Sequence, residues 1–495
     1  MRYEVMQMFN FDSPRPAGRL GVEGVVTDKE FIEKEIRNFK ASRRRAEMLA
    51  GEDYYAGCHD ILRKKRTAIG DDGELVEVKN LPNNRIVDNQ YRKLALQKSN
   101  YLLGRPVSFK TEDEAYAKLL AEIFDMRTQR RLKTLAKKAL NQGIAWLMPC
   151  YDADGALAFR FFNGYEIRPG WRDAEHTMLD YAIRLYSVIS YSGKEEEIVE
   201  KVEVYDEAGV SYFTLDDGTL KPEEPFRQPY FFSGDTPVNW TRIPLVAFKR
   251  DEEETPLLRN VKSLQDGLNT IESAFQDNMQ EDTRSTILIL KNYDGENLGK
   301  FRQNLATYGA VKVRTVDGSG GDVDKLSIEV NAENYKAILD IFRRAIIENG
   351  MGYDAKDERM KGSPNQMNIQ SMYSDIDLDA NDMEAEFQAA MEELLWFVRA
   401  HLANTGRGNF DGVQLEVIFN RDTLINEGEV IENIIRSEGL LSEETLIASH
   451  PWVDDPAQEM KRLEKQRKKE MESADVYGDA FRKNEPLRKG EGGDG

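Results

Sequence analysis

LLRNVKSLQDGLNTIESAFQDNMQEDTRS, residues 257–285, forms one long helical pattern with no proline after Pro256. Apolar residues recur in it at spacings of three and four, which places them on one stripe of a helix. A helix of this length would measure about 43 Å. Because only one side is apolar, the helix needs packing partners along its whole length. The stripe consists of Leu257, Val261, Leu264, Leu268, Ile271, Phe275 and Met279.

A second helix, over residues 332–350, is predicted to bring the chain back. The insert between the two helices contains β-rich runs at 286–290, 310–316 and 326–330, separated by glycine-containing turns. An insert of about 45 residues cannot bury much core by itself. The sequence therefore predicts a projecting pair of helices tipped by a small module that must pack on neighbours. Such a shape is typical of an assembly subunit.

Composition limits the remaining possibilities. The chain has 495 residues, a formal net charge of −20, two cysteines and four histidines. This composition predicts neither a disulfide framework nor a His- or Cys-based metal cluster, and we expect no cofactor. We find no apolar run that would serve as a signal peptide or span a bilayer, so we expect intracellular synthesis and no membrane partner. The negative charge argues against a protein that coats nucleic acid, but not against one that encloses it.

The rest of the chain changes character several times. A helix is predicted from Thr27 towards Met48, and further helices run to Asn141. The chain then becomes β-rich, with a hairpin around Asp152-Ala153-Asp154-Gly155 and an irregular stretch over 220–242. A long helix over 368–402, a strand over 413–419 and charged helical segments follow, and we expect the glycine-rich tail to be disordered.

Several segments, taken in order, resemble one family. They are Tyr54-Tyr55-Ala56-Gly57, Asn83-Asn84-Arg85-Ile86, Tyr101-Leu102-Leu103-Gly104-Arg105-Pro106-Val107, Ile243-Pro244-Leu245-Val246 and Ser449-His450-Pro451-Trp452-Val453-Asp454-Asp455-Pro456. Together with the helix–insert–helix unit, this ordered set is similar to the portal (head–tail connector) proteins of long-tailed phages of Gram-positive hosts. The resemblance covers roughly residues 50–465.

The resemblance implies an α+β portal-type subunit that assembles into a ring of about twelve copies around a channel for double-stranded DNA. Implied partners are the terminase large subunit, a head-completion or adaptor protein, and capsid and scaffolding proteins. The chain would lie at a capsid vertex of the virion, and in the host cytoplasm during assembly. The implied parts are an N-terminal arm (1–27), an α/β wing (28–256, continued as a long kinked helix and strand over 367–420), stem helices (257–285 and 332–350), a small α/β clip (286–331), a tunnel loop (351–366), a helical crown (421–475) and a flexible tail (476–495).

The resemblance also assigns candidate site residues. In a ring every cation of the tunnel loop would be repeated by symmetry into a belt of positive charge, whereas composition alone favours an ordinary loop between helices. The tunnel-loop residues are Lys356, Arg359, Lys361 and Asn365, with Asp354, Asp357 and Glu358 balancing the three cations. The clip interface would use Ile287, Ile289, Tyr293, Val311 and Val313, and the stem would pack through Leu264, Leu268, Ile271, Phe275 and Phe342.

Two alternatives use other features of the chain. Asp375, Asp377, Asp379, Asn381 and Glu386 stand at the spacing of a calcium loop, but Ala380 occupies the position that needs glycine and a helical stripe continues through them. We favour a solvated acidic face, and keep a metal-dependent DNA-processing enzyme that uses this cluster as the second hypothesis. A filament or coiled-coil scaffold that pairs through residues 257–285 is the third. We find no phosphate-binding loop, so a translocating ATPase would be a separate protein.

Overall fold

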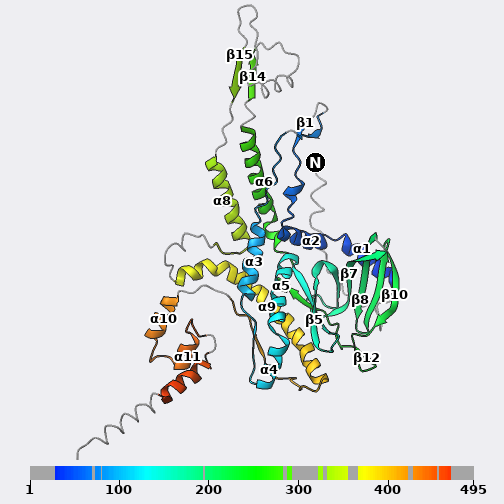
Figure 1. Cartoon of the computed structure of the whole chain (residues 1–495), viewed down its shortest axis with the longest axis vertical. Helices are drawn as coiled ribbons and strands as arrows, with labels where there is room; N and C mark the ends of the chain where they lie inside the picture. The colour runs from blue at the N-terminus through cyan, green and yellow to red at the C-terminus, as the bar shows by residue number, and fades with distance from the viewer. Residues whose placement is uncertain are drawn as a thin grey trace, which may run out of the picture. The chain divides into compact units, whose positions relative to one another are not determined.

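The computed structural model describes residues 28–69, 73–79, 81–192, 195–282, 287–291, 322–326, 332–354, 366–421, 427–453, 456 and 458–469. The chain divides into two compact units. Unit 1 comprises Met1–Asp354 and Asp375–Asp422, and unit 2 comprises Ala355–Ser374 and Thr423–Gly495. Figure 1 shows the elements of both units, which are described separately below.

Unit 1 begins with two helices where the sequence predicted one. α1 (Lys29–Lys40) is capped by Asp28, not by Thr27, and ends at Ala41. Ser42 then caps α2 (Arg43–Ala56) by accepting a hydrogen bond from the Arg45 amide. A serine that can satisfy the free amides of a helix start favours a new helix over continuation of the old one, which explains the break. Next come η1 (Asp60–Arg63), the hairpin β1 (Thr67–Ile69) and β2 (Leu75–Glu77), α3 (Gln90–Leu103), β3 (Ser108–Lys110), α4 (Glu114–Ile123) and α5 (Met126–Gln142).

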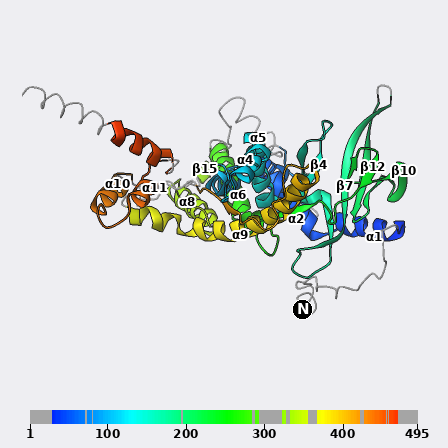
Figure 2. The ribbon, with the colours of Figure 1, turned by 90° about the horizontal axis from the view of Figure 1, so that it is seen from below.

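Two antiparallel sheets follow. The smaller has the strand order β13-β4-β5, with β4 (Ile144–Tyr151) in the centre and the predicted hairpin joining it to β5 (Leu157–Asn163). The larger has the order β10-β9-β8-β7-β6, and α1 packs on one of its faces (Figure 2). The prediction that residues 220–242 are irregular was wrong, because most of this stretch pairs as strands despite its prolines. The remaining bounds are β6 (Ile167–Trp171), β7 (Leu179–Ser192), β8 (Glu195–Asp206), β9 (Gly209–Asp216), β10 (Thr219–Gln228), β11 (Phe231–Ser233), β12 (Thr236–Val238) and β13 (Val246–Lys249).

β4 is the centre of the core because both of its faces are covered. Ala145 and Leu147 point into a cluster built from α3, α4, α5, α6 and α9, whereas Ile144, Trp146 and Met148 point into a second cluster with residues of β6 and β7. This alternation is the two-residue period of a strand.

The predicted pair of long helices is present. α6 (Leu258–Asp282) and α8 (Ala332–Asn349) pack against each other within unit 1 (Figure 1). Beyond them β14 (Ile287–Lys291) pairs with β15 (Asp322–Leu326) in antiparallel register, with Ile287 opposite Leu326. The third strand of the insert was therefore predicted about four residues too late. The predicted strand over 310–316 lies outside the described residues.

α9 (Gln366–Asn404) runs without a break over the stretch predicted as one long helix. Its residues 375–404 belong to unit 1, where β16 (Glu416–Ile418) also pairs with β3. Unit 2 contains α10 (Glu427–Arg436), α11 (Glu443–Ala448) and a helical stretch over 458–469. Among the described residues, no helix is both long enough and apolar enough to cross a membrane.

Candidate functional site

The most deeply buried side of α6 is polar. Gln265, Asn269, Ser273 and Asp277 stand four residues apart, and none is more than 1% exposed. Residues four apart lie one above the other on the same side of a helix, so the four side chains form one line along α6. Buried polar groups are costly unless they are hydrogen-bonded, so this line requires a matching partner.

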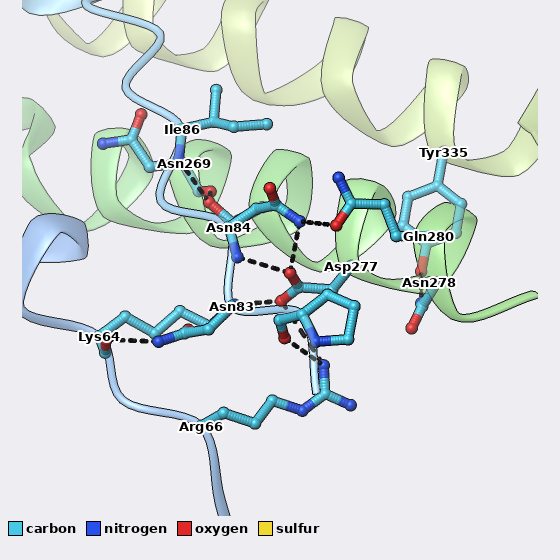
Figure 3. A network of polar contacts seen from close by, with 12 residues as sticks. Lys64, Arg66, Asn83, Asn84, Ile86, Asn269, Asp277, Asn278, Gln280 and Tyr335 are labelled. Carbon is cyan, nitrogen blue, oxygen red and sulfur yellow. Dashed lines mark hydrogen bonds and ion pairs between the residues drawn. The ribbon is translucent and has the colours of Figure 1, made fainter. Parts of the chain in front are cut away.

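The partner is the backbone over residues 84–91, which is extended as far as Asn89 and enters the first turn of α3 at Gln90. Its amides donate to the line of side chains one after another: Asn84 N to Asp277 at 2.6 Å, Ile86 N to Ser273 at 2.9 Å, Asp88 N to Asn269 at 3.1 Å and Tyr91 N to Gln265 at 3.0 Å. From Asn84 to Asp88 the two repeats stay in step, because two extended residues advance about 6.6 Å and four helical residues about 6.0 Å. The last step, from Asp88 to Tyr91, takes three residues because α3 begins there. We call this arrangement the polar seam (Figure 3).

Asp277 anchors the far end of the polar seam. Its carboxylate also accepts from the Asn84 side chain at 2.8 Å and from Lys64 Nζ at 2.7 Å, and Arg66 lies 3.6 Å away. Burial alone would raise the pKa of Asp277, but the hydrogen bonds from Asn84 and Lys64 outweigh it and hold the pKa below its usual value. The charged carboxylate therefore ties two separate pieces of chain, one with Lys64 and Arg66 and one with Asn84, to α6 (Figure 3).

His59 supports the middle of the polar seam through a hydrogen bond to Asn269. Its ring is buried, accepts from Asn269 Nδ2 at 2.8 Å through Nδ1, and lies 3.0 Å from the Tyr54 carbonyl through Nε2. Burial lowers its pKa, which favours the neutral ring with the proton on Nε2. Asn269 thus donates to His59 and accepts from Asp88, so its orientation is fixed.

The predicted stem residues lie on the side of α6 that meets α8 and the core. Leu268 is fully buried, Leu264 and Phe342 are partly buried against the core, and Ile271 is half-buried. Phe275 contacts Tyr335 of α8, with 4.6 Å between ring centres. The predicted stripe does not extend to Met279, which is 52% exposed. Between Leu268 and the end of α6 the fully buried positions are polar, because the partner there is a backbone and not an apolar surface.

Lys98, Arg250 and Asp379 form a buried ionic cluster beside the end of α8, which we call the ionic junction. Lys98 of α3 is 3% exposed, and its ammonium group lies 2.5 Å from Asp379 of α9 and 3.0 Å from the Met351 carbonyl. Arg250 holds the other oxygen of Asp379 at 3.1 Å and also donates to the Thr255 carbonyl just before α6. Two buried cations therefore join α3, the start of α6, the chain after α8, and α9.

The same helix, α3, holds the backbone where the predicted tunnel loop begins. A Cβ on Gly350 would lie 2.2 Å from a methyl group of Leu94, and one on Gly352 would lie 2.5 Å from the other methyl group. Gln97 donates to the Tyr353 carbonyl at 3.0 Å. The backbone of 350–353 is thus pressed against α3, and a Cβ at either glycine would require the Leu94 side chain to shift.

The remaining predicted site residues are described only in part. Lys356, Arg359, Lys361 and Asn365 lie outside the described residues, as do Tyr293, Val311 and Val313. Ile287 and Ile289 lie in β14, opposite Leu326 and Asp324 of β15.

Two of the four acids suggested as a metal site, Asp377 and Asp379, are engaged in other contacts. Asp377 bonds to Tyr101 and lies 3.4 Å from Arg421, while Asp379 pairs with the two buried cations described above. Arg421 also holds Glu384 and Asn381, each at 2.6 Å. The acids of this stretch that form ion pairs therefore point to different partners around α9 and not to one common point. Among the described residues, no group of three His, Cys, Asp or Glu side chains is placed to hold a metal ion.

Sequence reasoning missed the polar seam and the ionic junction. A signal for the polar seam was present: a four-residue spacing of Gln, Asn, Ser and Asp on one face of α6. It was overlooked because polar residues on an amphipathic helix are ordinarily assigned to solvent. Lys98 gave no such signal, since its partners, Asp379 and the Met351 carbonyl, are both more than 250 residues away in the sequence.

Comparison with known proteins gives consistent matches. A family model described as "Phage portal protein, SPP1 Gp6-like" matches residues 34–473. The chain is 28% identical over 426 residues to the portal protein of Bacillus phage SPP1, covering 85% of this chain and 83% of that protein. It is 25% identical over 440 residues to the portal protein of Clostridium phage phiCD119, covering 86% and 93%. A chain from the virion of a native gene transfer agent particle is similar with a TM-score of 0.39 and 12% identity, covering 72% of this chain and 87% of that chain.

Proposed function

Since this chain belongs to the SPP1 Gp6-like family of phage portal proteins, we propose that it forms a ring of about twelve copies whose central channel conducts double-stranded DNA. The family is structural and not enzymatic, and its members are components of the phage capsid. The proposed ring would occupy one capsid vertex, admit DNA during packaging in the host cytoplasm, and release it on ejection.

The observation that carries the proposal is the way α6 is fixed. A conduit for DNA has to withstand force along its channel, so its stem helices need lateral attachment to the body of the subunit. The polar seam supplies this attachment through four buried side chains along α6, and Arg343 of α8 adds contacts to Asp88 at 3.0 Å and to Glu272 at 2.7 Å. A stem held in this way moves together with α3 and not independently of it.

The tunnel loop is proposed to follow the backbone held by α3. Lys356, Arg359 and Lys361 come within eight residues after Tyr353, in a segment that also contains Asp357 and Glu358. Mixed charges repeated around a ring would favour brief contact with phosphates over tight binding. The β14–β15 end is proposed as the clip that docks the terminase large subunit during packaging and a head-completion protein afterwards, with Ile287 and Ile289 at that surface. Capsid and scaffolding proteins would contact the rest of the ring.

Two experiments test the proposal. Native mass spectrometry and electron-microscope class averages of the purified chain should show closed rings of about twelve subunits around a central hole. A stable monomer or dimer under all buffer conditions would count against the ring.

The second experiment replaces Lys356, Arg359 and Lys361 together by glutamine. Rings should still form, but packaging of DNA by the cognate terminase should fall. A matched control replaces Lys29, Lys93 and Lys118, which are exposed and far from this loop in the sequence, by glutamine. Packaging by the tunnel-loop variant at the level of the control would refute the role of the loop.

A further inference from the structure

The α5 helix carries charge of one sign only. Its cations are Arg127, Arg130, Arg131, Lys133, Lys137 and Lys138, and it contains no carboxylate, although the chain as a whole has a net charge of −20. Two of the six have partners in their own subunit: Lys138 pairs with Glu52 at 2.9 Å, and Arg131 lies over the Phe161 ring.

Of the other four, Arg127 and Arg130 are exposed, and Lys133 and Lys137 are partly exposed. Met126, Arg130, Lys133 and Lys137 follow one another at spacings of four, three and four, so they share one stripe, which we call the basic stripe. Met126 at its end is 80% exposed. Within the described residues the three cations of the stripe form no ion pair. Like charges three and four residues apart destabilise a helix, so an acidic partner would relieve a cost that the subunit alone bears.

α9 carries a stripe of the opposite sign. Asp375, Leu378, Asp382 and Glu386 follow one another at spacings of three, four and four, and we call them the acidic stripe. Leu378 is 57% exposed, and in the described part of the chain none of the three acids forms an ion pair. Asp377, Asp379 and Glu384 on other sides of the same helix all pair with cations of their own subunit. Of the three acids of the acidic stripe, Asp375 and Glu386 interact with the charges of Lys98 and Lys249, respectively, without forming an ion pair with them. The acidic stripe is therefore an exposed acidic surface of α9 in unit 1 whose carboxylates have no ion-pair partner among the described residues.

The two stripes match in length as well as in sign. Each spans twelve residues of helix, about 16.5 Å from the first to the last, and each includes one exposed apolar side chain. Figure 2 shows α5 and the first half of α9 on opposite sides of unit 1. A closed ring needs two different faces of the same subunit that fit each other, which is what two such stripes on opposite sides provide.

We infer that the basic stripe of one copy docks on the acidic stripe of the next, with Met126 and Leu378 contributing apolar contact, and that this contact closes the ring. The inference rests on the proposed function in requiring a ring. A nucleic acid is a poorer partner for the basic stripe, because it would leave the acidic stripe unmatched and would approach a strongly acidic protein.

Reversal of charge tests the docking. One variant carries Arg130→Glu, Lys133→Glu and Lys137→Glu, and the other carries Asp375→Lys, Asp382→Lys and Glu386→Lys. Each variant alone brings like charges together at every contact, so its yield of closed rings in native mass spectrometry should fall at least about tenfold, equivalent to a cost of at least about 1.4 kcal/mol summed over all contacts of the ring. Circular dichroism and thermal unfolding check that both variants fold.

Mixing the two variants gives the decisive result. In an alternating ring every contact again joins opposite charges, so the equimolar mixture should form closed rings that contain equal numbers of the two variants and an even total. Closed rings from either variant alone, or no rings from a mixture of two folded variants, would overturn the inference. Loss of DNA retention by variant rings that still close would assign the basic stripe to nucleic acid instead.

A second measurement needs no substitution. A zero-length carbodiimide cross-linker on wild-type rings should join Lys133 or Lys137 of one copy to Asp382 or Glu386 of another, recognised by mixing isotope-labelled and unlabelled copies. Cross-links between copies that never involve these residues would contradict the docking. Failure of the wild type to form rings would instead refute the proposed function, so the two failures are distinguishable.

Discussion

Lys98 and Asp379 form a buried ion pair, 2.5 Å between Nζ and Oδ2, that joins the chain on either side of the proposed tunnel loop. The same ammonium group donates to the carbonyl of Met351, a residue held at a positive φ of 49°. Met351 is the first residue of the loop and Asp379 follows it in α9, so a single side chain of α3 holds the chain both where the loop begins and after it ends. The backbone at the start of the loop is therefore fixed to α3.

Replacement of Lys98 by methionine should destabilise the subunit. Removing one partner of a buried pair leaves the other uncompensated, and here the Met351 carbonyl also loses its donor. Arg250 still pairs with Asp379, so we expect a loss of about 2–3 kcal/mol in the free energy of unfolding, below the usual cost of 3–5 kcal/mol. Denaturant unfolding measures this value. Lys93→Met, at an exposed position of the same helix, is the control and should change stability by less than about 0.5 kcal/mol.

The same lysine predicts a dependence on pH. Burial lowers the pKa of Lys98 to about 8, although Asp379 partly opposes this shift, and Arg250 and Asp375 are the other charged groups nearby. Between about pH 8 and the unfolded value near 10.5, the unfolded chain holds a proton that the folded chain has released, so the unfolding free energy rises with pH. Over this window the wild type should gain about 3 kcal/mol relative to Lys98→Met. A difference between the two proteins that does not change with pH would contradict the assigned pKa.

The sequence predicted the helices well where one face is apolar. The stripe from Leu257 to Phe275 and the stretch over 368–402 both form helices close to their predicted bounds, because hydrophobic periodicity is a local signal. The pairing of Ile287 with Leu326 was not predictable in this way, since strand register depends on a partner far along the chain. Lys98 and Asp277 were missed for a related reason: a charged residue that is buried by distant contacts looks the same in sequence as a solvated one.

Gly267→Ala should weaken the contact between α6 and α8. A Cβ at this position would lie 2.5 Å from the Phe342 ring, which is closer than side chains approach one another. Alanine favours an isolated helix by about 1 kcal/mol, yet the overpacked contact should cost about 1–3 kcal/mol, so stability should fall or stay level instead of rising. Thermal unfolding measures the net change. In the double variant Gly267→Ala/Phe342→Leu the smaller side chain relieves the clash, so the double variant should be more stable than the sum of the two single changes in stability predicts. Additive changes would refute overpacking as the reason.

Asp277→Ala should open the far end of the polar seam. Its carboxylate accepts from the Asn84 amide and from Lys64, and hydrogen bonds to a charged group contribute about 1.5–3 kcal/mol each. Hydrogen exchange measured by mass spectrometry should therefore become faster first at Asn84 and Ile86, while Tyr91, held by Gln265 at the other end, stays protected.

The matched control for Asp277→Ala is Gln276→Ala, because Gln276 is the preceding residue of α6 and its side chain is exposed. Gln276→Ala should leave exchange at Asn84 unchanged. The hydrogen bonds lower the pKa of Asp277. Their contribution to the unfolding free energy is therefore fully present at pH values above the ordinary aspartate pKa, and it is lost as the pH falls through the lowered pKa of Asp277. Acidification of the wild type should thus reproduce the Asp277→Ala pattern. Uniform exchange along 84–91 in the variant would mean that the polar seam opens as a single unit and that Asp277 is not its separate anchor.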